Sequence, residues 1–129
     1  MKIEHIAVGY NSEEDADNFF IELLGLKKIR SKSVPADLIE KFFGVKREQT
    51  FFVYANEDII FEVFITNDNS KAKDIFTHLC LVIENRDEFV NKASYLGFEL
   101  IKVPRKDSIG YYLFLRDTFQ NMYEIKEKI

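Results

Sequence analysis

Two stretches decide the fold: residues 2–10 read KIEHIAVGY, and residues 76–83 read FTHLCLVI. Both are rich in β-branched and aromatic residues, which favour strands. Each stretch is followed by the same succession of features, so the chain carries one pattern twice. An internal repeat of this kind predicts two similar structural modules in tandem.

An amphipathic helix is predicted after each of these strands. In the first half Ser12 fits an N-cap, apolar residues follow at the i, i+3, i+4, i+7 spacing, and Gly25 fits the C-cap. In the second half Asn85 and Glu88 resemble a capping pair, and Gly97 ends the apolar stripe. The chain after each glycine is also similar, LKKI in one half and FELI in the other.

Two apolar stretches then close each half. They are residues 50–54 (TFFVY) and 58–65 (DIIFEVFI) in the first half, and 111–115 (YYLFL) and 121–125 (NMYEI) in the second. Short stretches of this composition, separated by turn residues, predict antiparallel strands. Each half is therefore expected to contain a strand, a helix and then two or three antiparallel strands.

The predicted fold class is α+β, in a single domain that covers residues 1–129. Module 1 is expected at about residues 1–70 and module 2 at about residues 74–129. A half of about 60 residues is hard to stabilise alone, because it buries too little apolar surface. The two modules are therefore expected to pack on a shared core.

The halves differ at residues 35–44 (PADLIEKFFG), which predict a short extra helix with Pro35 in its first turn. Such an insert could cover a cavity. It could equally serve only to pack Leu38, Phe42 and Phe43, and this second interpretation is the one we favour from the sequence.

The composition indicates a soluble globular protein. Of 129 residues 47% are hydrophobic, which suffices for a sizeable core. The net charge of −4 and the absence of a Lys/Arg cluster argue against nucleic-acid binding. No stretch is long enough to span a membrane. The single cysteine, Cys80, excludes an internal disulfide and favours a reducing compartment, and the strand-like start leaves no room for a signal peptide. We therefore expect a cytoplasmic protein.

The two histidines of the chain, His5 and His78, occupy equivalent positions in the two halves. A single histidine is more often structural, but a matched pair favours a ligand role. Glu62 lies in an apolar strand (IIFEVFI), where an isolated carboxylate would be costly to bury. Glu124 stands at the matching place in the second half, although its charged surroundings also fit a solvent-facing position.

These four side chains predict a site for one divalent metal ion. Two imidazoles and two carboxylates suit Zn²⁺, Ni²⁺, Co²⁺, Mn²⁺ or Fe²⁺. Four protein ligands leave two octahedral positions for waters or for two oxygens of a substrate. A cation so placed polarises a carbonyl and stabilises an enediolate, and a glutamate that leaves the metal can act as the base.

The sequence resembles the vicinal oxygen chelate superfamily, which includes glyoxalase I, methylmalonyl-CoA epimerase, extradiol dioxygenases and fosfomycin- or bleomycin-resistance proteins. The resemblance covers nearly the whole chain and implies two βαβββ modules in a glyoxalase-like fold with curved, mixed sheets. It also implies metal ligands on the first and last strands of each module. The stretches that carry it are IEHIAV with His5, LLGLKKI, IIFEVF with Glu62, FTHLCLV with His78, and LRDTFQNMYEI with Glu124.

The last of these stretches resembles the Asp-Pro-x-Gly-Asn-x-x-Glu ending of the superfamily. Asp117, Asn121 and Glu124 are in register with this pattern. Thr118 and Gln120 replace its proline and its first glycine, so the turn departs from the pattern while the ligand is kept.

The four-ligand set is that of glyoxalase I, and the resemblance therefore implies a metal-dependent lyase or isomerase. Such an enzyme moves a proton next to a metal-bound carbonyl through an enediolate, with Glu124 or Glu62 as the catalytic base. The expected substrate is a small molecule, a hemithioacetal or a CoA ester. Arg105 and Arg30 are candidates to hold an anionic group of it, although an arginine of this kind is more often just a surface charge.

Three alternatives remain open. The chain could be a methylmalonyl-CoA-epimerase-like isomerase, or a drug-binding protein of the bleomycin-resistance type without turnover, or it could hold a purely structural metal. We expect a homodimer, in which the modules either close on each other within one chain or exchange between two chains.

Overall fold

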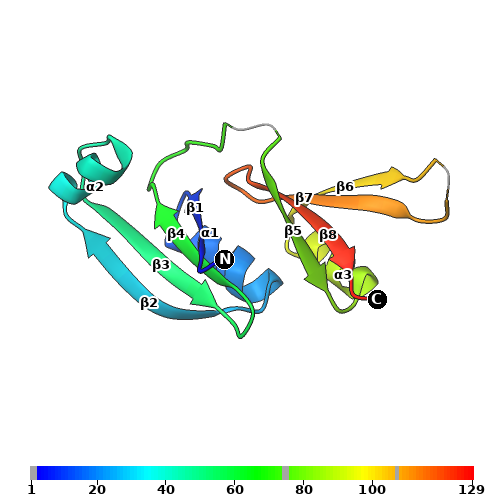
Figure 1. Ribbon diagram of the computed structural model, residues 1–129. Helices are drawn as coiled ribbons and strands as arrows, with labels where there is room; N and C mark the ends of the chain where they lie inside the picture. The colour runs from blue at the N-terminus through cyan, green and yellow to red at the C-terminus, as the bar shows by residue number, and fades with distance from the viewer. Residues whose placement is uncertain (1–2, 74–75, 107) are drawn as a thin grey trace. The chain divides into compact units, whose positions relative to one another are not determined.

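The computed structural model describes residues 3–73, 76–106 and 108–129. The chain divides into two compact units, Met1–Ser70 and Lys71–Ile129. Each unit contains one four-stranded sheet with its own helices (Figure 1). The packing of both modules on one shared core stays a prediction.

The first unit forms a mixed sheet. Its elements are β1 (Ile6–Tyr10), α1 (Glu13–Ala16), the π-helix η1 (Asp17–Leu23), β2 (Lys27–Val34), α2 (Ala36–Phe43), β3 (Gln49–Ala55) and β4 (Ile60–Ile65). The strand order is β1-β4-β3-β2, with β1 parallel to β4 and the other neighbours antiparallel.

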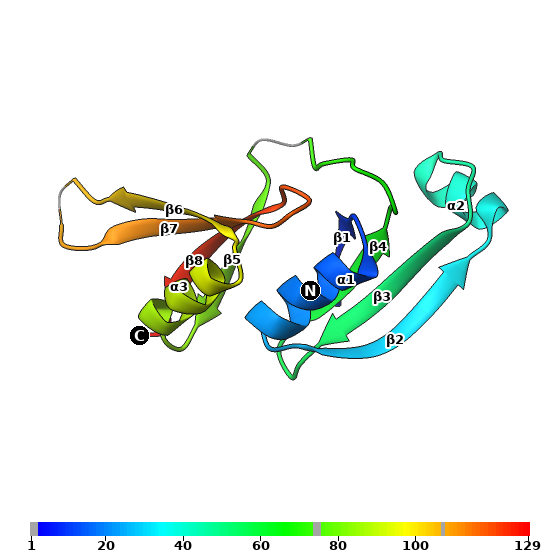
Figure 2. The same ribbon diagram turned by 180° about the vertical axis from the view of Figure 1, so that it is seen from behind.

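The second unit repeats this arrangement. Its elements are β5 (His78–Ile83), α3 (Arg86–Tyr95), β6 (Glu99–Pro104), β7 (Tyr111–Arg116) and β8 (Met122–Glu127). The order β5-β8-β7-β6, with β5 parallel to β8, matches that of the first unit strand for strand (Figure 2). The prediction of an α+β fold made of two βαβββ repeats is confirmed.

Local capping explains where the helices begin. The Ser12 hydroxyl accepts a hydrogen bond from the backbone N–H of Asp15 at 3.1 Å, and the Asn85 side chain accepts one from Glu88 at 3.0 Å. Both contacts satisfy N–H groups that a helix start otherwise leaves unpaired. Gly97, after α3, has a φ of 84°, a left-handed conformation that glycine adopts without steric cost.

Each unit buries one face of its sheet under its own helix. In the first unit α1 and η1 cover this face through an aromatic cluster whose neighbouring ring centroids lie 4.9 to 6.1 Å apart. Its members, all fully buried, are Tyr10, Phe19, Phe20, Tyr54 and Phe61. In the second unit α3 packs on β6 and β8, over Leu113, Leu115, Tyr123 and Ile125.

The extra helix predicted at residues 35–44 is α2, which lies at the end of the β2–β3 hairpin (Figure 1). Leu38, Phe42 and Phe43 are 38%, 65% and 60% exposed, so packing of these three side chains does not explain the helix. Its one buried side chain is that of Ile39. The second unit has no helix between β6 and β7 in its described residues.

Among the described residues, no helix combines the length and the apolar character needed to cross a membrane.

Candidate metal site

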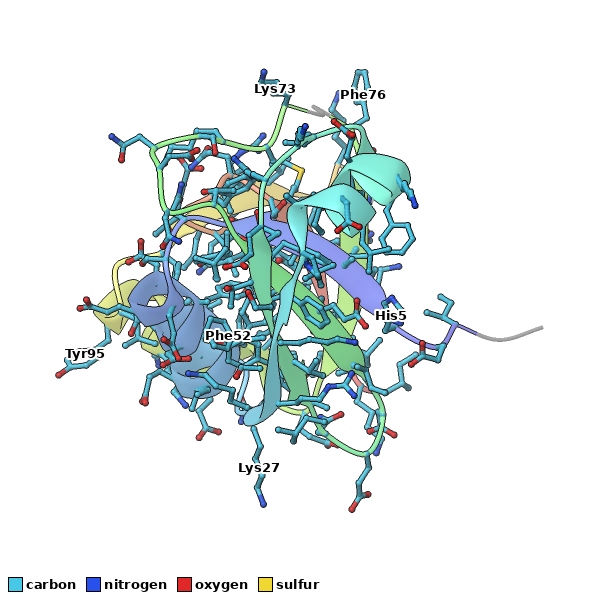
Figure 3. All side chains as sticks on the ribbon, turned by 90° about the vertical axis from the view of Figure 1, so that its left-hand side faces the viewer. His5, Lys27, Phe52, Lys73, Phe76 and Tyr95 are labelled. Carbon is cyan, nitrogen blue, oxygen red and sulfur yellow. The ribbon has the colours of Figure 1, made fainter. Side chains whose placement is uncertain are left out.

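Glu62 lies on the face of the first sheet that α1 and η1 leave uncovered. Side chains alternate along a strand, and the neighbours Phe61 and Val63 are buried under the helix, so Glu62 projects to the other side. His5 precedes β1 by one residue and reaches the same side as Ala7, the partner of Glu62 across the parallel pair. Figure 3 shows His5 at the N-terminal end of β1. We call this side of the first sheet the ligand face.

His5 and Glu62 form a pair on the ligand face. The Nε2 atom of His5 lies 3.4 Å from Oε1 of Glu62, and the side chains are 35% and 20% exposed. On the other edge of the ring, Nδ1 lies 2.5 Å from a carboxylate oxygen of Glu4. This hydrogen bond to Glu4 is the main cause of a raised pKa of His5, and the Glu62 carboxylate adds to the effect.

His78 and Glu124 form the matching pair in the second unit. Nε2 of His78 lies 3.8 Å from Oε2 of Glu124. The Nδ1 atom lies 2.9 Å from the backbone carbonyl oxygen of Phe76. The ring also packs edge-on against Phe114, with the centroids 5.5 Å apart. Glu124 lies between two buried residues of β8 in the sequence, so its side chain points to the opposite face of the sheet, as that of Glu62 does on β4.

The repeat extends to the cross-strand rows that hold the glutamates. In the first sheet Ala7, Glu62, Val53 and Arg30 are successive partners across the four strands. In the second sheet the row consists of Cys80, Glu124, Phe114 and Ile101. Each glutamate therefore has a small residue beside it on the parallel strand, which leaves room for a ligand near the carboxylate.

Both histidines present the same nitrogen to their glutamate. A carbonyl or carboxylate oxygen can only accept, so the neutral ring carries its proton on Nδ1 in both cases and keeps the Nε2 lone pair free. A hydrogen bond from the second ring nitrogen to a carboxylate or backbone carbonyl is the usual support of a metal-binding histidine. Each pair thus offers one imidazole nitrogen and one carboxylate, and this donor set fits a divalent transition metal.

The structure brings the predicted ligands together as two pairs. Among the described residues, no three or more His, Cys, Asp or Glu side chains form a group that could hold a metal ion. The joining of both pairs at one ion therefore stays a prediction.

The two candidate arginines lie in different settings. Arg30 is exposed and stands on the ligand face, in the same row as Glu62. Arg105 follows β6 in the second unit. Its guanidinium lies 4.1 Å from the ring centroid of Tyr112, and its backbone N–H donates a hydrogen bond to the Gly110 carbonyl. These contacts tie Arg105 to the end of the β6–β7 hairpin, and a substrate role for either arginine remains a prediction.

The turn before β8 is built around Asp117. The buried carboxylate accepts hydrogen bonds from the N–H groups of Phe119 and Asn121, the Asn121 amide and the Tyr123 hydroxyl, at 2.9 to 3.0 Å. Burial nevertheless raises the pKa of Asp117 to about 6. Gln120, where the superfamily pattern has glycine, adopts a φ of 72°. The turn fixes the start of the strand that carries Glu124.

Sequence reasoning missed a pocket of about 280 Å³ in the first unit. Ile39 and Phe43 of α2 line it together with Ala7 and Phe64 of the ligand face. Arg47, which the sequence did not single out, also lines it. The insert at residues 35–44 was the available signal, and its cavity-covering interpretation is the one that the pocket supports.

Cys80 is exposed on β5, in the row of Glu124. Partial burial and then the Glu124 carboxylate raise the pKa of its thiol. A raised pKa disfavours the thiolate, the form in which a cysteine acts as a nucleophile.

With two βαβββ repeats in the same strand order, the chain has a glyoxalase-like fold, which solved structures share with it over nearly its whole length. A glyoxalase family protein from Bacillus cereus is 17% identical, with a TM-score of 0.74 over 100% of this chain and 95% of the other. One from Enterococcus faecalis is 18% identical, with a TM-score of 0.70 over 96% and 95%.

The fosfomycin resistance protein FosX from Listeria monocytogenes, crystallised with Mn(II) and sulfate, has a TM-score of 0.70 to this chain. It is 14% identical, and the match covers 99% of this chain and 93% of the other. No family model matches the sequence. A comparison with curated proteins likewise found no match.

Proposed function

We propose that this chain is a metal-dependent enzyme that uses His5, Glu62, His78 and Glu124 to bind one divalent ion. The observation that carries the proposal is the repeated pair, an imidazole Nε2 facing a carboxylate in the same place of two equivalent sheets. A structural histidine in one unit needs no counterpart in the other. A shared ligand role explains why both the residues and their supporting hydrogen bonds recur.

Structures of the same fold support a divalent ion. The Listeria FosX was crystallised with Mn(II), and a mutant of it with Mn(II) and a dihydroxypropylphosphonic acid. For this chain the donor set admits Zn²⁺, Ni²⁺, Co²⁺, Mn²⁺ or Fe²⁺. The sulfur ligands that would select a softer metal are absent from both pairs.

The proposed reaction is a proton transfer next to a carbonyl, as in a lyase or isomerase of the glyoxalase I type. When bound, the ion supplies a positive charge that polarises the substrate oxygens and acidifies the neighbouring carbon. Glu124 or Glu62 takes the proton from that carbon and returns it. Both carboxylates are about one fifth exposed, so a substrate can reach them. His5 and His78 are held by Glu4 and by the Phe76 carbonyl, so the rings stay oriented.

The remaining parts of the proposal concern substrate and setting. A hemithioacetal or a CoA ester is the proposed substrate class, with methylmalonyl-CoA-epimerase-like chemistry as the nearest variant. A cytoplasmic homodimer is the proposed form of the protein. Val82, Val103 and Tyr112 are 65%, 48% and 43% exposed, and apolar area of this kind supports association.

A small-molecule-binding protein without turnover is the second candidate. The pocket beneath α2 favours it, because apolar walls can hold a ligand without any metal.

The first experiment is a metal titration of protein purified without a metal-binding tag. We expect one equivalent per chain by elemental analysis after incubation with each of the five ions, and loss of it in the variant His5→Ala/Glu124→Ala. The matched control is Glu99→Gln, which removes an exposed carboxylate outside both pairs. If the wild type binds no metal, the proposal is wrong, and a small-molecule-binding protein without turnover becomes the better interpretation.

Turnover is tested next on the loaded protein. Hemithioacetal and CoA-ester substrates are incubated in D₂O, and exchange of the carbon-bound proton is followed by NMR. Exchange that depends on Glu62 or Glu124 supports the enzyme, whereas bound metal without any exchange supports a structural or binding role.

A further inference from the structure

The pocket beneath α2 begins directly beside the His5–Glu62 pair. Ala7, which lines the pocket, is the cross-strand partner of Glu62. Phe64, which also lines it, stands two residues after Glu62 on the same face of β4. Two residues of a strand span about 7 Å, so a molecule of a few carbon atoms can reach from the pocket to the glutamate.

The walls of this pocket are apolar and come from the insert. Ile39 is buried, and the rings of Phe43 and Phe64 meet edge to face with their centroids 5.6 Å apart. The helix therefore covers the ligand face next to the pair. Because the second unit has no corresponding helix in its described residues, the cover is a feature of one unit only.

Three polar side chains line the pocket, those of Arg47, Gln49 and Thr66, and that of Arg47 is charged. The Gln49 amide already donates to the carbonyls of Thr50 and Ile65. The buried Thr66 hydroxyl has no hydrogen-bond partner of normal geometry, although it contributes weakly to lowering the pKa of Asp68.

Arg47 is the charged member of this set. It is exposed and forms no ion pair among the described residues, and its charge also helps to lower the pKa of Asp68. Its guanidinium is the group best suited to an anion, because it offers several N–H donors in one plane.

We propose that the pocket binds a short aliphatic substrate group that ends in a carboxylate or a related anion, with Arg47 as the anion-binding residue. The proposal rests on the function proposed above, since it places the other end of the substrate at His5 and Glu62. About 280 Å³ is at the small end of ligand pockets. The pocket therefore holds a short acid or acyl chain, and a whole glutathione or CoA molecule does not fit inside it.

Binding of hexanoate to the metal-free full chain tests the pocket separately from the metal site. Hexanoate and its neutral analogue hexanamide are titrated into ¹⁵N-labelled protein, and amide resonances of Ala7, Gly9 and Phe64 report occupancy. We expect both probes to shift these resonances. In the variant Arg47→Gln, hexanoate should bind about fivefold more weakly, while hexanamide binds as before, because only the charge is lost.

The matched control is Lys41→Gln, which removes an exposed positive charge from α2 but leaves the pocket lining intact. Hexanoate should bind this variant as it binds the wild type. Ile39→Val, which trims one methylene from the wall, should weaken both probes alike. Absence of shifts with hexanoate, or equal hexanoate affinity in Arg47→Gln and wild type, would overturn the proposal even if the protein binds metal. Loss of metal binding alone would leave these results unchanged and would count against the proposed function only.

Discussion

Asp117 shows what a single buried carboxylate contributes to the site. It is 1% exposed, and its two oxygens accept four hydrogen bonds that close the turn before β8. The turn fixes where β8 begins and therefore the position of Glu124 in the sheet. Its pKa is raised to about 6 because the charged form loses its hydration on burial, and the hydrogen bonds only partly offset this loss.

The raised pKa of Asp117 predicts a pH dependence of stability. The folded chain holds this proton more tightly than the unfolded chain, whose carboxyl has a pKa near 3.8. Asp117 therefore contributes most stability below about pH 4, and the contribution is lost as the pH rises through about 6. Asp117→Asn cannot titrate, so the wild type should lose about 2–4 kcal/mol of unfolding free energy relative to the variant between pH 4 and pH 7.

Urea unfolding of both proteins at pH 4, 5.5 and 7 measures this difference. The variant is expected to be less stable at low pH, because an amide offers only one acceptor oxygen to four donors. Parallel pH profiles of the two proteins would show that Asp117 keeps an ordinary pKa.

Gln120 carries backbone strain in the same turn. A side chain at a φ of 72° crowds the following carbonyl, and glycine avoids this cost. Gln120→Gly should therefore raise the free energy of unfolding by about 0.5–1 kcal/mol. Thermal unfolding measures the gain, with Thr118→Gly as the control at an exposed position of the same turn. An unchanged or lowered stability would mean that the contact of the Gln120 side chain with the Asp117 carbonyl compensates the strain.

At the scale of elements, the N-cap of α3 is a contact that sequence and structure both identify. Asn85→Ala leaves the N–H of Glu88 without its acceptor and should destabilise the second unit by about 1 kcal/mol. Ser94→Ala, at an exposed position inside the same helix, should change little. Amide exchange across α3 would locate the effect, and equal protection of the helix in Asn85→Ala and wild type would contradict it.

The elements that the sequence predicts are those that local chemistry determines. Ser12 and Asn85 fix helix starts through hydrogen bonds within three residues, and apolar strands are recognisable by composition alone. The π-helical turns from Asp17 to Leu23 were not foreseen, and the cavity-covering role of α2 was named but not favoured. Both depend on which side chains approach from distant strands, as Tyr54 does when its hydroxyl donates to Asp17.

At the scale of the whole molecule, the proposed function predicts one ion shared by residues of both units. His5→Ala and His78→Ala should then each abolish metal binding, rather than each removing one of two independent ions. Metal should also raise the midpoint of thermal unfolding and protect amides of both β4 and β8 from exchange, because a ligand bound only by the folded state stabilises it. Two equivalents per chain, with one lost in each variant, would refute a shared ion.

The candidate site was predictable to the extent that the repeat was visible. His5 pairs with Glu62 and His78 with Glu124 because the same strand positions recur in both halves, which a sequence displays directly. The matching hydrogen bonds at Nδ1 of the two histidines were not predictable as a pair. Glu4 is next to His5 in the chain, but the partner of His78 is the backbone carbonyl of Phe76, which has no side-chain signature. Arg47 was missed for a similar reason, because only the fold of the insert brings it to the pocket.

The exposed thiol on β5 gives the protein a built-in attachment point for a probe. Cys80 is the one cysteine of the sequence, and it stands beside Glu124 in the parallel strand pair. A nitroxide label attached there would sit next to a proposed ligand without any engineered residue, and the raised pKa of the thiol means that labelling needs a distinctly alkaline pH. Paramagnetic Mn²⁺ bound at that glutamate would broaden the label's spectrum, and diamagnetic Zn²⁺ would not, so occupancy could be read spectroscopically in unmutated protein.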